Sequence, residues 1–417
     1  MLQSAKVENI KKWLEDINSF NSTPDFGTTR VLFTKPELEA RNYVKNEMKK
    51  IGLKVHEDSI GNIFGVLEGE DTSLPPVWTG SHIDTVLNAG MFDGMTGVVG
   101  GMEALRIIKE SGKKFKRSIV VIVYTSEEPT RFGLCCLGSR ALAGKLSYEE
   151  TKEVYDKDGK SLAIVLEELG YNKDDFKKIP VKKGDVFGAV ELHIEQSSKL
   201  EKDNVKIGIV KTICAPTNFE VEVIGCQSHA GGTSMEDRKD AYVASAELAL
   251  ILEKLAKESK SEYTTATVGR VAVIPNASNV IPGNVKFSID IRDCEFESKN
   301  ILIEKLKKEI AKIEEKRGVK VNLTLENHDV PMKCNKKIID EIEKICKNQD
   351  ISHEFMISGA YHDSMFVGEF APVAMIFVPS KNGISHSPDE WTDFEDIAKG
   401  TNILAETLYN LSNMEEL

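Results

Sequence analysis

The chain has 417 residues, with 54 Lys+Arg against 66 Asp+Glu, so its formal net charge is −12. Hydrophobic residues make up 41% and charged residues 29%, which is the composition of a folded protein with a sizeable core. The acidic balance argues against a nucleic acid or an anionic membrane as partner, because both would need clustered Lys and Arg.

Residues 1–20 alternate charged and apolar side chains like an amphipathic helix, so we predict no signal peptide there. No apolar run approaches the ~18 residues needed to span a bilayer. The seven cysteines lack CxxC spacing, and an odd number suits a reducing compartment better than a disulfide framework. We therefore expect a cytoplasmic protein.

From about residue 30 to 200, strand-like apolar runs alternate with helical patterns. The run SIVVIVYTSEE is rich in β-branched residues, which is typical of a strand buried on both faces. The alternation indicates an α/β domain whose functional residues lie where strands end. We predict helices at 36–53 and 96–112 and strands at 62–69, 75–84, 118–128 and 189–196.

The pattern changes near residue 214, where strands and helices follow in the order βαββαβ. This order indicates a small α+β insert with an antiparallel sheet. After about residue 328 the α/β pattern returns, with a helix at 336–349, a strand at 373–380 and a helix at 396–411. We therefore predict a discontinuous catalytic domain with a central sheet flanked by helices (1–213 and 329–417) and an inserted domain (214–328).

Several candidate metal ligands stand at predicted strand ends, and Asp93 lies on a tight turn just before a predicted helix. Taken singly, each has an ordinary structural explanation: a satisfied histidine, a solvated pair of glutamates, or an Asp-Gly turn. Together they supply three imidazoles, an aspartate and two glutamates, which suffices for two divalent metals bridged by one carboxylate, with a general base left over. The candidates are His82, Asp93, Glu127, Glu128, His193 and His386, with Asp84 placed to orient the imidazole of His82.

Six motifs follow one another in an order that resembles the M20 family of binuclear metallohydrolases: GSHIDTV, FDGMTGV, SEEPTRFGLCCLGSR, ELHIEQ, SHAGGTSMEDRKDA and ISHSPDEW. The resemblance is strongest to the hydantoinase/carbamoylase branch, which includes N-carbamoyl-L-amino-acid hydrolases, allantoate amidohydrolases and ureidoglycolate amidohydrolases. It covers nearly the whole chain and implies a catalytic α/β domain with a ferredoxin-like lid that also dimerises.

The resemblance implies a role for each candidate in the centre. His82 and His193 would hold one metal, Glu128 and His386 would hold another, and Asp93 would bridge them. Glu127 would be the general base that deprotonates the metal-bridging water, with Asp84 behind His82. The native metal stays open between Mn, Zn, Co and Ni, because their preferences overlap at a His/carboxylate site.

The resemblance also implies residues that contact the substrate. His229, in a Gly-rich turn, would come from the partner subunit of a homodimer and stabilise the oxyanion; alternatively it is a loop histidine without a role. Gln196 would bind the ureido group, Asn279 and Arg292 would grip a carboxylate, and Gly359 would offer backbone contacts. The alternative for Arg292 is a strand arginine that pairs with Asp290 or Asp293.

The sequence departs from the commoner branch pattern next to the expected substrate. Pro129 replaces a Gly, Ser197-Ser198 replaces Gly-Pro, and Tyr361 and Ser364 replace Gly and Ala. The combination is most similar to ureidoglycolate amidohydrolases, and it puts the identity of the substrate in doubt.

We therefore expect an amidohydrolase that cleaves the ureido C–N bond of ureidoglycolate, allantoate or an N-carbamoyl-L-amino acid and releases ammonia and carbon dioxide. An M20-type aminopeptidase or dipeptidase is the first alternative, and a non-catalytic small-molecule-binding protein is the second.

Overall fold

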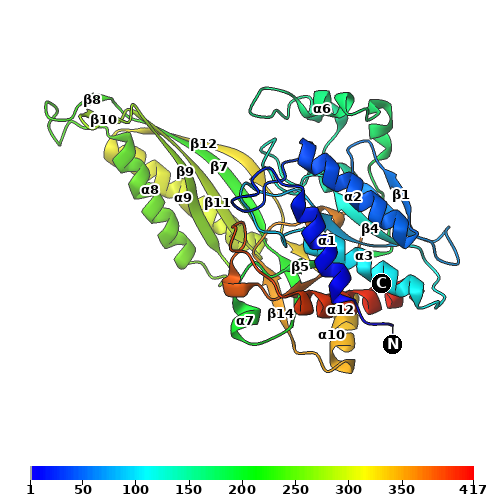
Figure 1. Cartoon of the computed structure of the whole chain (residues 1–417). Helices are drawn as coiled ribbons and strands as arrows, with labels where there is room; N and C mark the ends of the chain where they lie inside the picture. Colours follow the sequence, from blue (N-terminus) through cyan, green and yellow to red (C-terminus); the bar gives the residue numbers. More distant parts are fainter. Residues whose placement is uncertain (1) are drawn as a thin grey trace. The chain divides into compact units, whose positions relative to one another are not determined.

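The computed structural model describes residues 2–417, which divide into two compact units (Figure 1). Unit 1 comprises the chain up to Lys211 together with Lys333–Met356 and His362–Leu417. Unit 2 comprises Thr212–Met332 and Ile357–Tyr361. The domain limits drawn from the sequence, at 213/214 and 328/329, stay predictions.

Unit 1 is built on a nine-stranded mixed sheet with the order β1-β2-β4-β3-β5-β15-β6-β13, and β14 pairs with β6. Strands β4, β3, β5 and β15 run parallel to one another, whereas β2 lies antiparallel to β1 and β4, and β6 lies antiparallel to β15. Helices flank this sheet, which confirms the predicted α/β class. The strands of unit 1 are β1 (Lys54–Glu57), β2 (Ile63–Leu67), β3 (Val77–His82), β4 (Ile119–Tyr124), β5 (Gly188–Ile194), β6 (Ile207–Ile213), β13 (Met332–Lys333), β14 (His353–Ser358) and β15 (Val373–Val378).

Helices α3 and α12 pack against each other and against the central strands. All six residues of β4 are buried, as its β-branched composition predicts for a strand covered on both faces. The helices of unit 1 are α1 (Val7–Ser19), α2 (Lys35–Ile51), α3 (Met95–Glu110), α4 (Leu137–Leu142), α5 (Tyr148–Thr151), α6 (Leu162–Glu168), α7 (Lys199–Lys202), α10 (Lys336–Asn348), α11 (Ser364–Val367) and α12 (Phe394–Asn413), with 3₁₀ turns η1 (Lys173–Lys178) and η2 (Lys381–Gly383).

Unit 2 is a four-stranded antiparallel sheet with the order β12-β7-β11-β9, covered by two helices. Alternate residues of β7, such as Phe219, Val221 and Val223, point into one apolar core that also contains the buried faces of both helices. A two-stranded ribbon extends from the sheet. The elements are β7 (Ala215–Ile224), β8 (Ser228–His229), α8 (Ala241–Lys257), β9 (Thr265–Ile274), β10 (Val280–Ile281), β11 (Asn284–Asp293), α9 (Phe296–Arg317) and β12 (Lys320–His328).

Among the helices of residues 2–417, none combines the length and the apolar character that crossing a membrane requires.

Candidate metal centre

Four parallel strands bring the predicted ligands of unit 1 to one edge of the sheet. His82 ends β3, Glu127 and Glu128 follow β4, and His193 lies near the end of β5. His386 follows β15 and the turn η2. Because the carboxyl ends of parallel strands meet at one edge, residues some 300 positions apart in sequence become neighbours in space.

The Asp93 carboxylate lies between two pairs of ligands, and each of its oxygens faces a different pair. Oδ1 lies 3.2 Å from Nε2 of His193 and 4.0 Å from Nε2 of His82. Oδ2 lies 2.9 Å from Nε2 of His386, which is itself 3.2 Å from Oε1 of Glu128. Donors around one tetrahedral ion with bonds of ~2.1 Å are separated by about 3.4 Å, so both groups fit a divalent cation.

Two of the imidazoles are held in the tautomer that a metal needs. Nδ1 of His82 lies 3.0 Å from the carbonyl oxygen of Asp84, and Nδ1 of His193 lies 2.9 Å from the carbonyl oxygen of Ile194. A carbonyl oxygen only accepts, so each Nδ1 carries a proton and donates it. Each Nε2 atom then faces Asp93 and is the ring nitrogen left to bind a metal.

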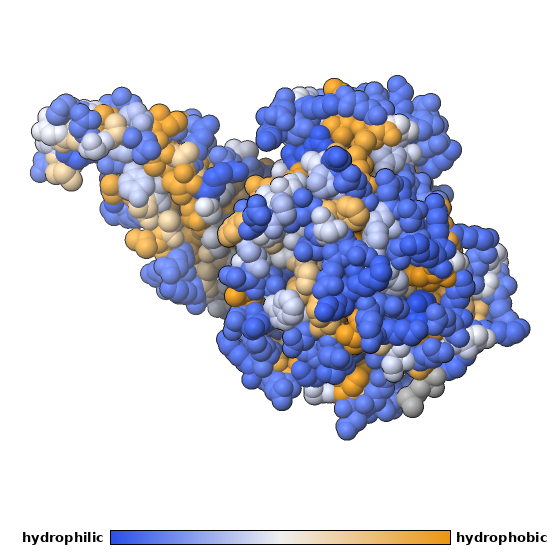
Figure 2. Space-filling view, viewed as in Figure 1, coloured by the Kyte–Doolittle hydropathy of each residue, from blue (hydrophilic) through white to orange (hydrophobic). Residues whose placement is uncertain are grey.

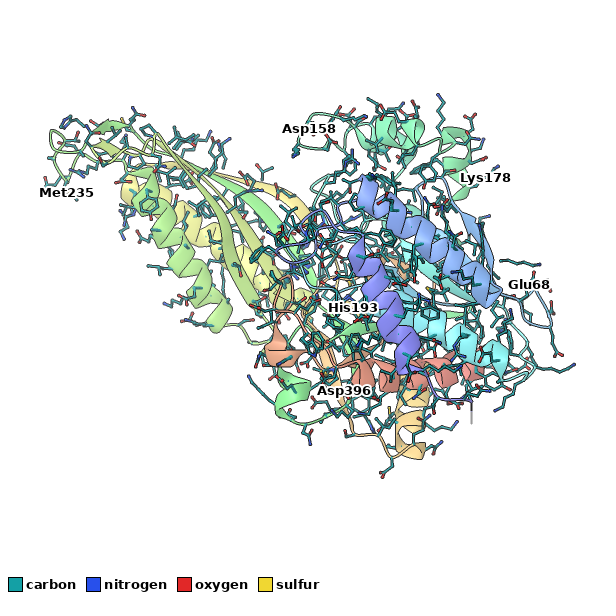
Figure 3. All side chains as sticks on the ribbon, viewed as in Figure 1. Glu68, Asp158, Lys178, His193, Met235 and Asp396 are labelled. Carbon is teal, nitrogen blue, oxygen red and sulfur yellow. The ribbon has the colours of Figure 1, made fainter. Side chains whose placement is uncertain are left out.

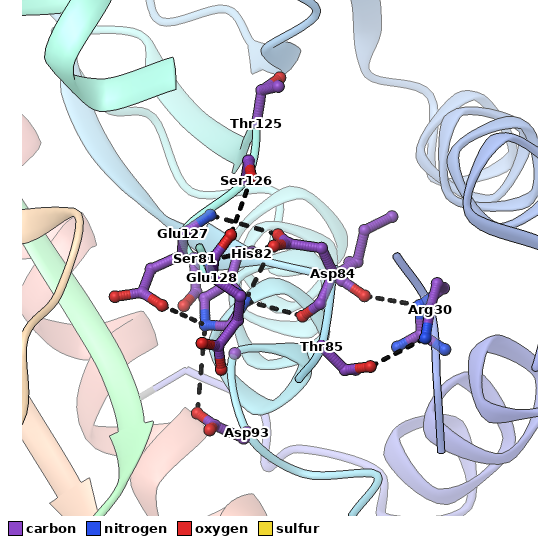
Figure 4. A network of polar contacts seen from close by, with 12 residues as sticks. Arg30, Ser81, His82, Asp84, Thr85, Asp93, Thr125, Ser126, Glu127 and Glu128 are labelled. Atoms are coloured by element: carbon purple, nitrogen blue, oxygen red, sulfur yellow. Dashed lines mark hydrogen bonds and ion pairs between the residues drawn. The ribbon is translucent and has the colours of Figure 1, made fainter. Parts of the chain in front are cut away.

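Asp84 organises the centre differently from the sequence-based expectation. Its backbone carbonyl, rather than its carboxylate, makes the closer contact with His82, and the carboxylate oxygen is 3.6 Å from Nδ1. The carboxylate instead accepts the backbone N–H of Glu127 (3.3 Å) and Glu128 (3.1 Å), as Figure 4 shows. Asp84 therefore fixes the loop that carries both glutamates as well as the histidine.

Unusual backbone conformations surround the centre. Ser126, Gln196 and His386 have positive φ angles of 55–56°, a region that non-glycine residues rarely adopt. Gly94, at φ 68°, follows Asp93, and a Cβ there would lie 2.4 Å from Nε2 of His82. Such strain persists only where surrounding contacts enforce it, and it concentrates at functional sites.

The acidic groups of the centre shift the pKa values of the imidazoles that face them. Hydrogen bonds to Asp93 and Glu128 raise the pKa of His386 to about 10. Burial lowers the pKa of His193, but the hydrogen bond to Asp93 and the charges of Asp93 and Glu191 together outweigh burial and raise it to about 9. Burial raises the pKa of Asp93, but hydrogen bonds from these two histidines hold it well below its usual range. The carboxylates therefore demand positive charge, which imidazolium or a metal ion supplies.

Glu127 lies beside this cluster, with Oε2 3.9 Å from Nε2 of His82. Burial, followed by the charges of Glu128 and Asp363, raises the pKa of Glu127 well above its usual range. A carboxylate in such surroundings holds a proton more tightly than one in water, as a general base must. The thiol of Cys136 donates to its Oε1 over 3.7 Å.

Gln196 is the one predicted substrate residue that lies in unit 1. Its Nε2 donates to Oδ2 of Asp93 over 3.1 Å, whereas its Oε1 is buried and has no hydrogen-bond partner among the described residues. An unpaired buried acceptor is costly and is satisfied when a donor arrives.

The remaining predicted residues lie in unit 2, in two places. Arg292, near the end of β11, forms a bidentate pair with Asp290 (2.9 and 3.1 Å) and donates to the carbonyl oxygen of Gly359 (3.1 Å). The alternative of a pair with Asp290 is therefore what the ligand-free chain contains. His229 and Asn279 lie at the ribbon, where Ala230 N–H donates to the Asn279 carbonyl oxygen. Met235, in the loop after β8, marks this tip in Figure 3.

Arg292 and Asn279 are thus far apart within the unit 2 of a single chain. Asn279 precedes the start of β11 at Asn284, and Arg292 stands eight residues further along this strand. At ~3.3 Å per residue the strand alone separates them by roughly 26 Å. A small carboxylate cannot contact both residues of one chain.

Two further groups lie at the centre that sequence analysis did not assign. Glu390 accepts hydrogen bonds from the backbone N–H groups of Phe92 and Asp93. Glu191 and His362 form a third cluster with His193, and the rings of His193 and His362 are 4.6 Å apart. Glu390 stands in the same motif as His386, and this proximity was the only feature of the sequence that could have pointed to a role for Glu390 at the centre.

The fold and the centre define a class of protein. Residues 78–410 match peptidase family M20/M25/M40, and the chain belongs to this family. It is therefore a hydrolase of amide-type C–N bonds.

Its relatives narrow the class. The chain is 41% identical to the ureidoglycolate hydrolase of Arabidopsis thaliana, over 98% of this chain and 87% of the relative. It is 38% identical to the N-carbamoyl-L-amino-acid amidohydrolase of Pseudomonas sp. (strain NS671), over 96% and 97% of the two chains. The solved structure of AtUAH in complex with glyoxylate is similar with a TM-score of 0.89 and 42% identity, over 99% of this chain and 98% of that one.

Proposed function

We propose that the chain is a binuclear metal-dependent amidohydrolase that cleaves the ureido C–N bond of a small carboxylate. Water attacks the ureido carbonyl, ammonia leaves, and the carbamate product decomposes to carbon dioxide and a second nitrogen product. The observation that carries the proposal is the Asp93 carboxylate, whose two oxygens face different ligand pairs beside a buried Glu127.

The donor set fits two divalent ions. His82 and His193 would hold one, Glu128 and His386 the other, and Asp93 both. Two such ions polarise the carbonyl and lower the pKa of water toward neutrality when bound. Mn, Zn, Co and Ni all suit these imidazole and carboxylate ligands.

Glu127 moves the proton. Its carboxylate takes a proton from the attacking water and delivers it to the leaving nitrogen, which departs as ammonia. Asp84 holds the backbone of Glu127 and keeps the base in place.

Gln196 and Arg292 are the two residues proposed to bind the substrate. Gln196, with its unpaired buried Oε1, accepts from the ureido NH₂ group. The guanidinium of Arg292 moves its two hydrogen bonds from Asp290 to the substrate carboxylate and keeps its contact with the backbone of Gly359. Ureidoglycolate or allantoate is favoured over N-carbamoyl-L-amino acids, because Pro129, Tyr361 and Ser364 depart from the carbamoylase pattern and the Arabidopsis relative is a ureidoglycolate hydrolase.

A panel of ureido acids and dipeptides, assayed for ammonia release and for peptide cleavage with added Mn²⁺ or Zn²⁺, tests this substrate class. Ammonia from ureidoglycolate or allantoate supports the proposal. Cleavage of dipeptides alone would make the chain a peptidase, and binding without turnover would make it a non-catalytic binding protein.

Unit 2 is proposed as a ferredoxin-like lid that also dimerises. Its strand order and βαββαβ succession are those of a ferredoxin-like sheet. Strand β9 is an edge with exposed Val271 and Ile274, and α8 exposes Tyr242 and Leu250. Figure 2 shows apolar residues among the polar ones of this unit. Strand β9 pairs with β11 on one side only, and an apolar strand with an unpaired outer edge favours pairing with a second copy of the chain.

In this homodimer His229 and Asn279 act in trans. The separation of Arg292 from Asn279 along β11 supports this assignment, because two chains are needed to bring both residues to one small acid. His229 would then donate to the oxyanion that develops on the ureido carbonyl of the partner's substrate.

Mixed dimers test the assignment. If Glu127→Gln and His229→Ala chains are unfolded and refolded together, random mixing gives about half mixed dimers, each with one site that carries neither lesion. About a quarter of all sites should therefore regain full activity, although each variant alone is nearly inactive. Mixed dimers that form without recovery would contradict action in trans.

A cytoplasmic location is proposed as well. Within residues 2–417 all seven cysteines are free, which suits a reducing compartment.

A further inference from the structure

We propose that Glu390 is a positioning residue that ties the loop of Asp93 to the loop of His386 and thereby sets the affinity of the ion shared by Asp93, Glu128 and His386. This inference rests on the metal centre of the proposed function. Glu390 belongs to neither proposed ligand pair, and its carboxylate contacts backbone N–H groups and Ser385.

The contacts of Glu390 reach both loops. Its Oε1 accepts the backbone N–H of Phe92 (2.9 Å) and of Asp93 (3.1 Å). Its Oε2 accepts the hydroxyl of Ser385 over 2.8 Å, and Ser385 directly precedes His386. Glu390 is only 4% exposed, so these hydrogen bonds form away from water.

The packing around Glu390 leaves its carboxylate little freedom. A Cβ on Gly90 would lie 2.4 Å from both Cβ and Oε1 of Glu390. Phe92 is fully buried, and its ring lies 5.3 Å from that of Trp391 and 5.8 Å from that of Phe394. The Asp93 loop is therefore held against the segment after His386 by both polar and aromatic contacts.

His386 needs such support more than the other ligands do. Its side chain is 49% exposed, whereas those of His82, Asp93 and His193 are at most 7% exposed. It stands on an irregular loop at φ 55° rather than on a strand. Without the tie, this imidazole must be ordered by the ion itself, and that ordering reduces affinity. Loss of an outer partner of a ligand typically costs 10–100-fold in metal affinity.

The test is a competition titration of the metal-free full-length chain with Mn²⁺ or Zn²⁺ against a chelator, which requires no turnover. The parent should bind two ions. Glu390→Ala should bind one ion as the parent does and the second about 10–100-fold more weakly. Glu390→Gln should recover most of this loss, because its amide oxygen still accepts both backbone N–H groups and its NH₂ donates to Ser385. Asp389→Ala, which removes the adjacent exposed carboxylate, should bind like the parent.

Gly90 supplies an independent perturbation. Gly90→Ala should displace the carboxylate and weaken the same ion without altering Glu390. In Gly90→Ala/Glu390→Gly both the carboxylate and the Cβ that the new methyl group would meet are absent, so the double variant should lose no more affinity than Glu390→Gly alone. Additive losses would show that the two residues act separately and would overturn the inference.

The other outcomes are distinct. If the parent binds two ions and Glu390→Ala binds both equally tightly, with a melting temperature showing that it is folded, Glu390 does not position the ligands and the proposed function stands. Equal weakening of both ions, or no recovery by Gln, would assign Glu390 a general structural role instead. A parent chain that binds no ion would overturn the metal centre and this inference together.

Discussion

A buried lysine of unit 2 and the buried carboxylates at the metal centre of unit 1 are compensated in different ways. Unit 2 buries the ammonium group of Lys299, which donates to the carbonyl oxygens of Ala215 (3.0 Å), Pro216 (3.3 Å) and Asp329 (2.6 Å). Unit 1 buries Asp93, Glu127 and Glu128 together, and the groups that face them are mainly imidazoles.

This difference separates a structural charge from a functional one. The Lys299 ammonium is stabilised by hydrogen bonds to three backbone carbonyl oxygens and joins the segment of Ala215 and Pro216 to that of Asp329. The carboxylates of unit 1 depend on positive charge that comes from solution, as protons or as metal ions. A buried charged group whose partners all come from the chain stabilises the fold. A buried charged group that lacks some of these partners can bind a proton or a metal ion from solution.

The largest effect should come from the base of unit 1. Glu127→Gln removes the proton acceptor but none of the proposed ligands, so kcat should fall by ~10²–10⁴ while two metal ions remain bound. Ammonia release and metal content, measured on the same sample, check this. Parent-like turnover with both ions present would remove Glu127 from the mechanism.

The second effect should appear in unit 2 as a loss of stability. Lys299→Met removes the shared donor of three carbonyl oxygens, of which that of Pro216 keeps the Asp329 N–H, and should lower the free energy of unfolding by about 2–4 kcal/mol. Metal affinity should stay at the parent value, because Lys299 contacts none of the ligands. Denaturant unfolding with a parallel metal titration tests both statements, and weaker metal binding would break the distinction drawn between the units.

Substitution of Arg292 should have a smaller effect, and on KM. Arg292→Lys keeps the charge but loses the bidentate fork, so the KM for a ureido acid should rise about 10-fold or more, with kcat less affected. Steady-state kinetics with the acid and with its uncharged amide show whether the carboxylate is what Arg292 recognises. An equal loss for both compounds would assign Arg292 to the support of Gly359 instead.

The smallest effect is a dependence of stability on pH in the metal-free chain. The pKa values of His193 (about 9) and His386 (about 10) are raised above 6.5, so their contribution is complete below pH 6.5 and is lost as pH rises through 9–10. The melting temperature of the chelated chain should therefore fall between pH 6.5 and 9. His193→Gln should flatten this slope. A melting temperature that rises over the same interval would contradict the protonated imidazoles.

Much of this architecture could be predicted from local sequence. The buried strand β4 and the helices α2 and α12 follow from β-branched runs and from apolar periodicity with clear ends, such as Gly52 in the left-handed conformation after α2. Strands β6 and β14 were not predicted, because their place depends on pairing between segments about 140 residues apart.

The candidate ligands were predictable as a set because chemistry restricts which residues bind metals, but their supports were not. Sequence spacing suggested the carboxylate of Asp84 as the partner of His82, whereas the backbone carbonyl makes the closer contact. Glu390 accepts hydrogen bonds from backbone N–H groups about 300 residues away in sequence. Every residue except proline carries such a group, so the residue types give no indication of this contact. For Arg292, sequence spacing could not decide between an ion pair with Asp290 and the binding of a substrate carboxylate.

The position of β15 has a consequence for the order in which the chain acquires structure during synthesis. β15 lies between β5 and β6 in the middle of the sheet, although it is the last strand to leave the ribosome. Unit 2, whose βαββαβ elements are contiguous, can fold while β5 and β6 still expose unpaired edges. At 5–20 residues per second, the roughly 165–185 residues up to the end of β15 take about 10–40 seconds, when aggregation or a chaperone competes for these edges. His386 is the last of the proposed ligands in sequence and follows β15. The nascent chain therefore cannot assemble its complete set of ligands until β15 has been synthesised.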